Sequence, residues 1–155
     1  MSLPISICFL EITGESTCQE FEMTEADEHH LRAAEGWLDL DHAVEAGQEL
    51  ESISPEFKAH PAVLLLRCRF YLEVHKPENA HVIAVTLTEK LPDVPDGWFY
   101  LACASARLNR NEEVESALKK CFLTAVQRNE EEKWQERALA APDLDGFWCA
   151  NQRSV

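Results

Sequence analysis

The chain has 155 residues, of which 46% are hydrophobic, and this length and composition fit about one globular domain rather than a wholly disordered chain. Its 28 acidic and 14 basic residues give a net charge of −14. This charge argues against a nucleic-acid binder and against docking on an anionic membrane surface, since both need clustered cations. Its five glycines never cluster, which excludes a glycine-rich phosphate loop.

The segment 1–22 precedes any helical pattern and holds four acidic side chains and no basic one. It includes a short apolar stretch over positions 3–10, which no basic residue precedes and Glu11 follows, so no signal peptide is expected. We interpret residues 1–22 as an N-terminal extension, which is either disordered, a short strand or an apolar segment lying on the folded part, and hypothesise that it is dispensable. Thr24 is a natural N-cap for the first helix, because acidic residues follow it.

From this point the sequence matches itself when it is shifted by 34 positions. Three units follow without a gap, over residues 27–60, 61–94 and 95–128. Small or apolar residues recur in equivalent positions of the three units: Ala34, Cys68 and Ala102, and Ala46, Ala80 and Val114. Small residues let two antiparallel helices approach closely, and Leu40, Leu50 and Leu118 are expected to fill the space beside them.

Each unit predicts two helices joined by a polar turn. Apolar residues at helical spacing predict helices over residues 63–74 and 79–91 in the second unit and over 98–108 in the third. Pro77 is expected in the first turn of the second of these helices, which accepts proline. Asn111 is the expected N-cap of the helix that follows in the third unit. In the first unit, Asp41 lies at the turn between the helices.

The period, the paired helices and the residues in these positions resemble a tetratricopeptide repeat (TPR) protein. The family's bulky, small and proline positions are matched in the first unit by Trp37, Ala46 and Leu50, in the second by Tyr71, Ala80 and Pro92, and in the third by Trp98, Leu101, Ala102, Leu108, Val114 and Leu118. At the turns, where the family has glycine, the chain has Asp41, His75 and Asn109. The resemblance covers about residues 24–128 and implies an all-α fold, an α-solenoid of three helix–turn–helix units within residues 23–128.

The last segment, residues 129–155, does not continue the pattern and is interpreted as C-terminal capping helices. It predicts one more helix over residues 129–141, then a turn and a short helix. The last full repeat has an open apolar side that must be covered. Four large apolar residues are expected to cover it: Trp134, Leu139, Leu144 and Trp148.

No motif in the chain predicts catalysis, a cofactor or a metal site. The six cysteines form no Cys-x-x-Cys pair, and free, mostly buried thiols in a reducing cytoplasm are expected. His29 and His30 are adjacent on a predicted helix and therefore point in different directions, which suits a metal poorly. Cys68 and Cys103 are interpreted as packed thiols rather than nucleophiles. An enzyme with a non-local site is left as an alternative, and it would need a deep polar pocket with several titratable groups.

The resemblance implies that the first helix of each unit lines a concave groove that binds a partner. The family's groove positions correspond to ten residues of this chain: Leu31, Arg32, Glu35, Asp39, Leu65, Arg69, Glu73, Phe99, Tyr100 and Arg107. Leu66 and Cys103 also fall on such positions, with inter-repeat packing as their alternative role.

The function implied is a non-enzymatic protein–protein interaction scaffold in the cytoplasm. Its partner is an unknown protein or peptide, and the acidic first unit favours a neutral or basic segment. Chaperone-binding members of the family clamp a C-terminal carboxylate with basic and amide side chains, but Leu31 and Glu35 occupy those positions here, which argues against an acidic tail. The alternative is a structural module that self-associates through the solenoid ends or the N-terminal apolar segment, and a monomer or weak homo-oligomer is expected.

Overall fold

The computed structural model describes residues 23–152, and in this part of the chain every regular element is helical. The all-α class predicted from the sequence is therefore confirmed. The elements are α1 (Glu25–Asp39), α2 (Ala43–Ser52), the 3₁₀ turn η1 (Pro55–Phe57), α3 (Pro61–Glu73), α4 (Pro77–Lys90), α5 (Pro95–Arg107), α6 (Asn111–Gln127), α7 (Glu131–Ala140), the 3₁₀ turn η2 (Pro142–Leu144) and α8 (Asp145–Gln152). None of these helices is long and apolar enough to cross a bilayer.

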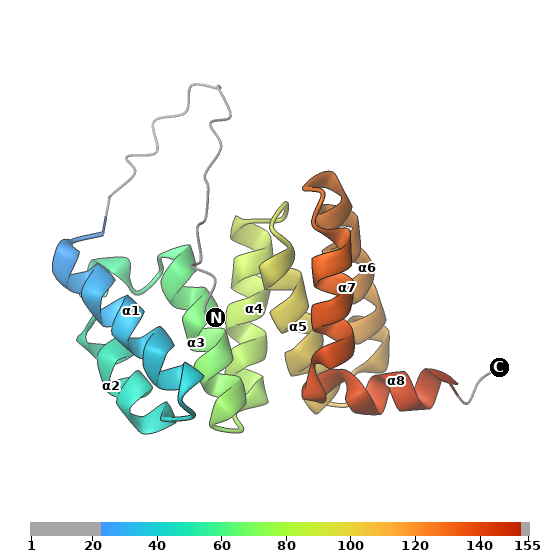
Figure 1. The fold of residues 1–155 in the computed structure, drawn as a ribbon, viewed down its shortest axis with the longest axis horizontal. Coiled ribbons are helices and arrows are strands. Elements are labelled where there is room, and N and C mark those ends of the chain that lie inside the picture. The colour runs from blue at the N-terminus through green and yellow to red at the C-terminus, as the bar shows by residue number, and fades with distance from the viewer. Residues whose placement is uncertain (1–22, 153–155) are drawn as a thin grey trace.

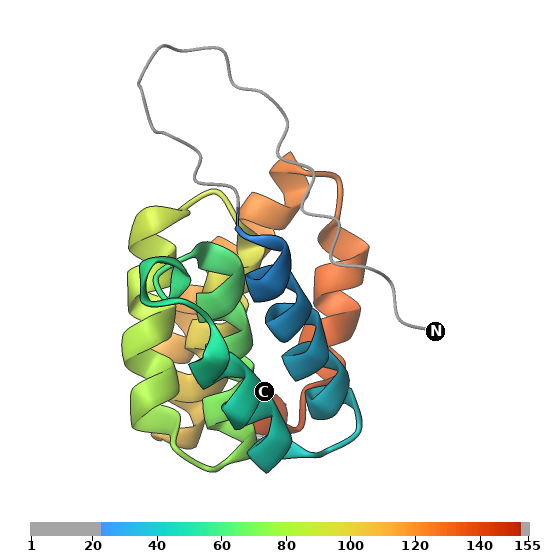
Figure 2. The same ribbon diagram turned by 90° about the vertical axis from the view of Figure 1, so that its left-hand side faces the viewer.

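Six of the helices form three antiparallel pairs, α1 with α2, α3 with α4, and α5 with α6 (Figure 1). The pairs follow one another along the long axis of the molecule, and seen from the α1–α2 end they lie one behind another (Figure 2). The first helices of neighbouring pairs also touch, α1 against α3 and α3 against α5. Each predicted unit thus contains one helix pair, except that α1 begins at Glu25, shortly before the unit that starts at position 27.

The turn inside each pair has the same backbone conformation at intervals of 34 positions. Asp41, His75 and Asn109 have positive φ angles of 60°, 56° and 58°. Asp, Asn and His adopt this left-handed conformation more readily than other side chains do, so they replace the glycine that usually ends a helix in this way. The same hydrogen bond closes the helix before each turn: His42 N to Trp37 O (2.9 Å), Lys76 N to Tyr71 O (2.8 Å) and Arg110 N to Ser105 O (2.9 Å).

The core is built on the recurring small residues. All six of the recurring positions quoted above are 0% exposed: Ala34, Cys68, Ala102, Ala46, Ala80 and Val114. Leu50 and Leu118 are also buried beside them, as expected. Leu40 is 64% exposed, so the prediction that it fills the space inside the pair is wrong. It is the C-cap residue of α1, where the chain is already leaving the helix, and its side chain lies outside the pair.

Three helices start at a proline: the starts of α3 and α5 lie earlier than predicted, and Pro77 lies in the first turn of α4, as predicted. Pro61, Pro77 and Pro95 are the first residues of α3, α4 and α5. Proline suits the first helical turn because its missing N–H needs no partner there. Asn111 is the first residue of α6 rather than its N-cap, and Arg110 takes the cap position without a side-chain hydrogen bond. The Asn111 capping prediction is therefore wrong.

The N-terminus of α1 is capped as the sequence predicts. The Thr24 hydroxyl accepts a hydrogen bond from the Asp27 backbone N–H (3.2 Å) and donates one to Asp27 Oδ2 (2.6 Å). The buried Asp27 carboxylate also accepts a hydrogen bond from the Ser54 N–H (2.7 Å), which ties α1 to the connection between the first two pairs. The predicted extension over residues 1–22 lies outside the described residues.

After α6 the chain adds one packed helix and then turns away. Trp134 of α7 is 1% exposed and Leu144 of η2 is fully buried, so both cover the last pair as expected. Trp148 of α8 is half-buried, and its indole N–H donates to the Ala138 carbonyl (3.1 Å). Leu139 is 66% exposed, so its predicted capping role is wrong: it lies on the face of α7 that turns away from the core.

Candidate binding groove

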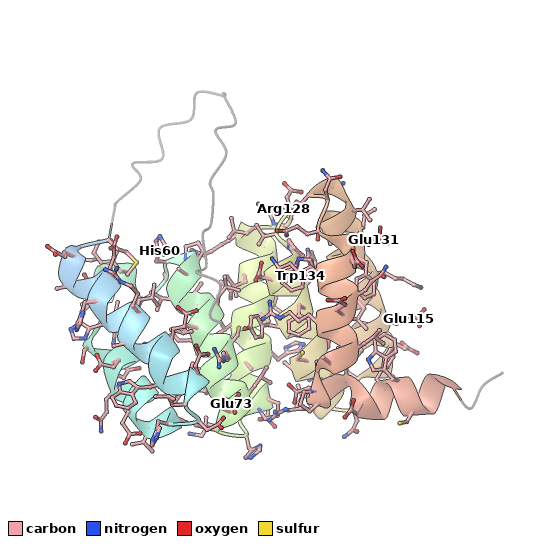
Figure 3. All side chains as sticks on the ribbon, in the orientation of Figure 1. His60, Glu73, Glu115, Arg128, Glu131 and Trp134 are labelled. Carbon is pink, nitrogen blue, oxygen red and sulfur yellow. The ribbon has the colours of Figure 1, made fainter. Side chains whose placement is uncertain are left out.

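A groove of about 290 Å³ lies on the face formed by α3, α5, α7 and the connection from α7 to η2. Figure 3 labels Glu73 and Trp134, which lie toward opposite ends of this face. The helices reach the face side by side because the small core residues let the pairs pack closely. The groove is lined by Arg69, Leu72, Glu73, Phe99, Tyr100, Cys103, Arg107, Arg137, Ala140, Ala141, Pro142 and Asp143.

Half of the ten predicted groove residues line this groove, and half lie outside it. Those that line it are Arg69, Glu73, Phe99, Tyr100 and Arg107. Those that do not are Leu31, Arg32, Glu35, Asp39 and Leu65. Asp39 is nevertheless joined to the groove, because its carboxylate accepts an ion-pair contact from Arg69 (2.8 Å). Arg32 instead lies beside His29 and His30 on α1 and contacts the Glu28 carboxylate at 3.5 Å.

The aromatic anchors of the groove are not equally accessible. Phe99 is 5% exposed and packs against Trp134 with ring centroids 5.7 Å apart, so it forms the groove floor. Tyr100, which follows it on α5, is half-buried. Leu66 and Cys103 are both buried, so the packing alternative holds for Leu66, and Cys103 contributes only to the floor. Tyr100 is therefore the aromatic side chain that a partner would reach.

Arg137 on α7 is a groove residue absent from the predicted set. Its guanidinium lies over the rings of Phe99 and Trp134, 4.5 and 4.8 Å from their centroids. It also donates a hydrogen bond to the Tyr100 hydroxyl (3.2 Å). Burial raises the pKa of Tyr100, which keeps this hydroxyl protonated, and the charge of Arg137 opposes that shift only in part. The aromatic contacts hold the guanidinium in one place at the groove wall.

The repeat spacing carries the signal that would have found Arg137. Glu35, Arg69, Cys103 and Arg137 follow one another at steps of 34 positions and lie on α1, α3, α5 and α7; the last three line the groove, and Glu35 lies outside it. The predicted repeat ends at residue 128, but this position continues into the capping helix. We call these four residues the shared groove position.

Arg107 lines the groove but is engaged within the protein. Its Nε contacts the Asp143 carboxylate of η2, and its Nη1 donates to the Leu72 carbonyl of α3 (2.5 Å). Nη1 also lies 3.2 Å from Nδ1 of His75. Arg107 therefore joins α5 to α3 and to η2, a structural role that its sequence position alone does not reveal.

The α1 end of this face carries an excess of negative charge. Burial and the neighbouring charge of Asp39 raise the pKa of Glu35, while Arg69 acts in the opposite direction. Arg69 forms its ion pair with Asp39. Within residues 23–152, Glu35 has no ion pair of its own.

The buried cysteines and His30 are held in the protein as protonated thiols and as an ion-pair partner, respectively. Burial raises the pKa of the Cys68 and Cys121 thiols to about 12 and that of Cys103 further, so these thiols stay protonated. His30 is paired with the Glu49 carboxylate of α2 (2.7 Å). Across the described residues no group of three His, Cys, Asp or Glu side chains is placed to hold a metal ion.

A scan of protein-family models and searches of curated proteins and solved structures found no match to this chain.

Proposed function

We propose that this protein is a non-enzymatic scaffold, an α-solenoid of three tetratricopeptide-type repeats with a C-terminal cap, that binds a peptide or protein segment in its groove. The repeat assignment is supported by the left-handed turns and the buried small residues, both of which recur every 34 positions. The free, buried thiols of Cys68, Cys103 and Cys121 favour the reducing cytoplasm as its compartment.

The observation that carries the binding proposal is the fixed pair of Tyr100 and Arg137 on the groove wall. Aromatic and arginine side chains supply most of the binding energy in protein interfaces. Here both are held by neighbours before any partner arrives: the ring packs against Phe99 and the guanidinium against two rings. These two side chains therefore lose little conformational entropy when a partner binds.

Capture of a partner from a cell lysate by the intact chain, read by mass spectrometry, tests this proposal. The groove variant is Arg69→Glu with Tyr100→Ala. Its matched control is Lys119→Glu with Val82→Ala, which makes the same kinds of change at exposed positions on α6 and α4. Circular dichroism checks that both variants keep their helices.

A partner bound by the wild type and the control but lost from the groove variant supports the proposal. A partner that all three proteins bind equally places the interface elsewhere and contradicts it. The loss should be about tenfold or more, because truncating a central aromatic residue commonly costs more than about 1 kcal/mol and the charge reversal adds to it.

Self-association is the second candidate, and it is favoured by apolar side chains exposed at both ends of the row of pairs. At one end Leu40 and Val44 are 64% and 71% exposed, and at the other Leu123 and Leu139 are 61% and 66% exposed. Light scattering over a range of concentrations distinguishes the two candidates. A mass that rises with concentration, and that falls back in a Leu139→Gln variant, favours self-association through the α7 end.

A further inference from the structure

The charges along the shared groove position change sign from one end of the face to the other. Glu35 lies at the α1 end, Arg69 on α3, Cys103 on α5 and Arg137 on α7. Glu35 does not line the groove, but it lies near Asp39 and Arg69 on its α1 side, so an extended occupant that continues from the groove past α3 also meets Glu35.

The acidic end is not neutralised within the part of the chain that the structure describes. There Glu35 has no ion pair, and Asp39 beside it pairs with Arg69. A basic side chain of an occupant would therefore meet two carboxylates and the guanidinium of Arg69 here. Such a side chain gains favourable charge interactions on arrival.

At the other end Arg137 is the groove arginine with the weakest carboxylate contact. The carboxylate contact of its guanidinium is with Asp96 Oδ1, at 3.7 Å. Arg69 contacts Asp39 at 2.8 Å, and Arg107 is engaged by Asp143 and the Leu72 carbonyl. Of the three groove arginines, Arg137 therefore has the least neutralised charge, since its other polar contact is with the uncharged Tyr100 hydroxyl, and it can attract an incoming carboxylate.

We infer that the groove, together with the α1 surface beside it, selects an extended segment with charges of opposite sign at its two ends, a basic side chain placed against Glu35 and a carboxylate placed against Arg137. Three helix-to-helix steps of about 8–10 Å separate these residues, so about seven to nine extended residues span them. Because the two ends of the groove differ in charge, the segment binds in one direction only. This inference rests on the proposed function and specifies the chemistry of its partner.

The Arg137 end refines the expectation drawn from the first repeat unit. The acidic residues near α1 favour a basic segment there. The α7 end favours an acidic group, which the charge of the first unit does not predict. A uniformly basic or uniformly acidic segment would match one end and be repelled, or left unpaired, at the other.

The test is selection from a phage-displayed library of random twelve-residue peptides with the full-length chain as bait. The wild type should enrich peptides that carry Lys or Arg and Asp or Glu about seven to nine residues apart, always in the same order. Glu35→Gln should lose the preference for the basic residue only, and Arg137→Gln the preference for the acidic residue only. Arg32→Gln and Glu136→Gln, both at exposed positions, are the controls and should select the same peptides as the wild type.

Calorimetry with one enriched peptide tests whether Arg137 pairs with the acidic residue of that peptide. Arg137→Gln should weaken binding about tenfold, and neutralising the acidic residue of the peptide should abolish that difference. Because Arg137 also packs on two rings, Arg137→Lys serves as a second variant that keeps the charge, and it should retain the acidic preference.

The failures of the two proposals are distinguishable. Enriched peptides that bind the groove, as shown by their loss in a Tyr100→Ala variant, but that have no charge order would overturn the inference and leave the proposed function standing. No enrichment, or enrichment that Tyr100→Ala leaves unchanged, would contradict both.

Discussion

Arg107 was predicted to contact a partner, but in the structure its side chain holds neighbouring elements of the protein together. Its guanidinium connects three elements, α5, α3 and η2, through Asp143 and the Leu72 carbonyl. We expect Arg107→Gln to destabilise the protein even when no partner is present. A residue that served only to bind a partner would leave stability unchanged.

The magnitude follows from the contacts that are lost. Hydrogen bonds to charged groups contribute about 1.5–3 kcal/mol each, but the Arg107 side chain is 26% exposed and water replaces part of what is removed. A net loss of about 1.5–3 kcal/mol is therefore expected for the whole side chain. For a chain of this size each kcal/mol lowers Tm by about 2–4 °C, so Tm should fall by about 3–12 °C.

Thermal unfolding followed by circular dichroism measures this effect, with Arg32→Gln as the matched control. Arg32 contacts the Glu28 carbonyl at 3.3 Å and the Glu28 carboxylate at 3.5 Å, and its side chain is 70% exposed, so it should contribute about 0–1 kcal/mol. Equal Tm values for the two variants would refute the structural role assigned to Arg107. Urea unfolding at room temperature gives the same comparison.

Two further predictions concern α1 and its neighbours. Gly36→Ala should raise the free energy of unfolding by about 0.5–1 kcal/mol, because the added methyl group meets no atom and alanine has the higher helix propensity. Gly47→Ala should stabilise the protein less or destabilise it, since its methyl group would lie 3.0 Å from the Phe70 ring. Equal gains for the two variants in urea unfolding would contradict this. The Ser54 N–H is the main cause that lowers the pKa of Asp27, so the contribution of this carboxylate to stability is present above its pKa in the unfolded chain and is lost as the pH falls. Asp27→Asn should therefore lower Tm at pH 7 but by much less below about pH 3. A difference in Tm that does not depend on pH would contradict this.

The helical pairs could be predicted because their signal is local and repeated. A small residue at position 34 means little alone, but its recurrence at 68 and 102 places a buried helix contact, and all three side chains are fully buried. The starts of α3 and α5 were less predictable than that of α4, because a proline before an apolar run is compatible both with a preceding turn and with the first helical residue. The exposure of Leu40 also depends on the left-handed turn at Asp41, which a pattern of apolar residues does not encode.

The groove was only partly predictable. Which positions line it follows from the repeat period, but which of its charged residues are already paired depends on contacts between helices. Arg137 belongs to the predictable part, because it stands one repeat period after Cys103 when the same spacing is extended into the cap. The ion-pair partners belong to the part that was not predictable: Arg69 pairs with Asp39 and Arg107 with Asp143, and each pair joins two different helical elements. These pairings follow from how neighbouring helices are rotated against one another. They determine which arginines are engaged within the protein and which keeps donors for a partner, so a groove position in the sequence is not yet a binding residue.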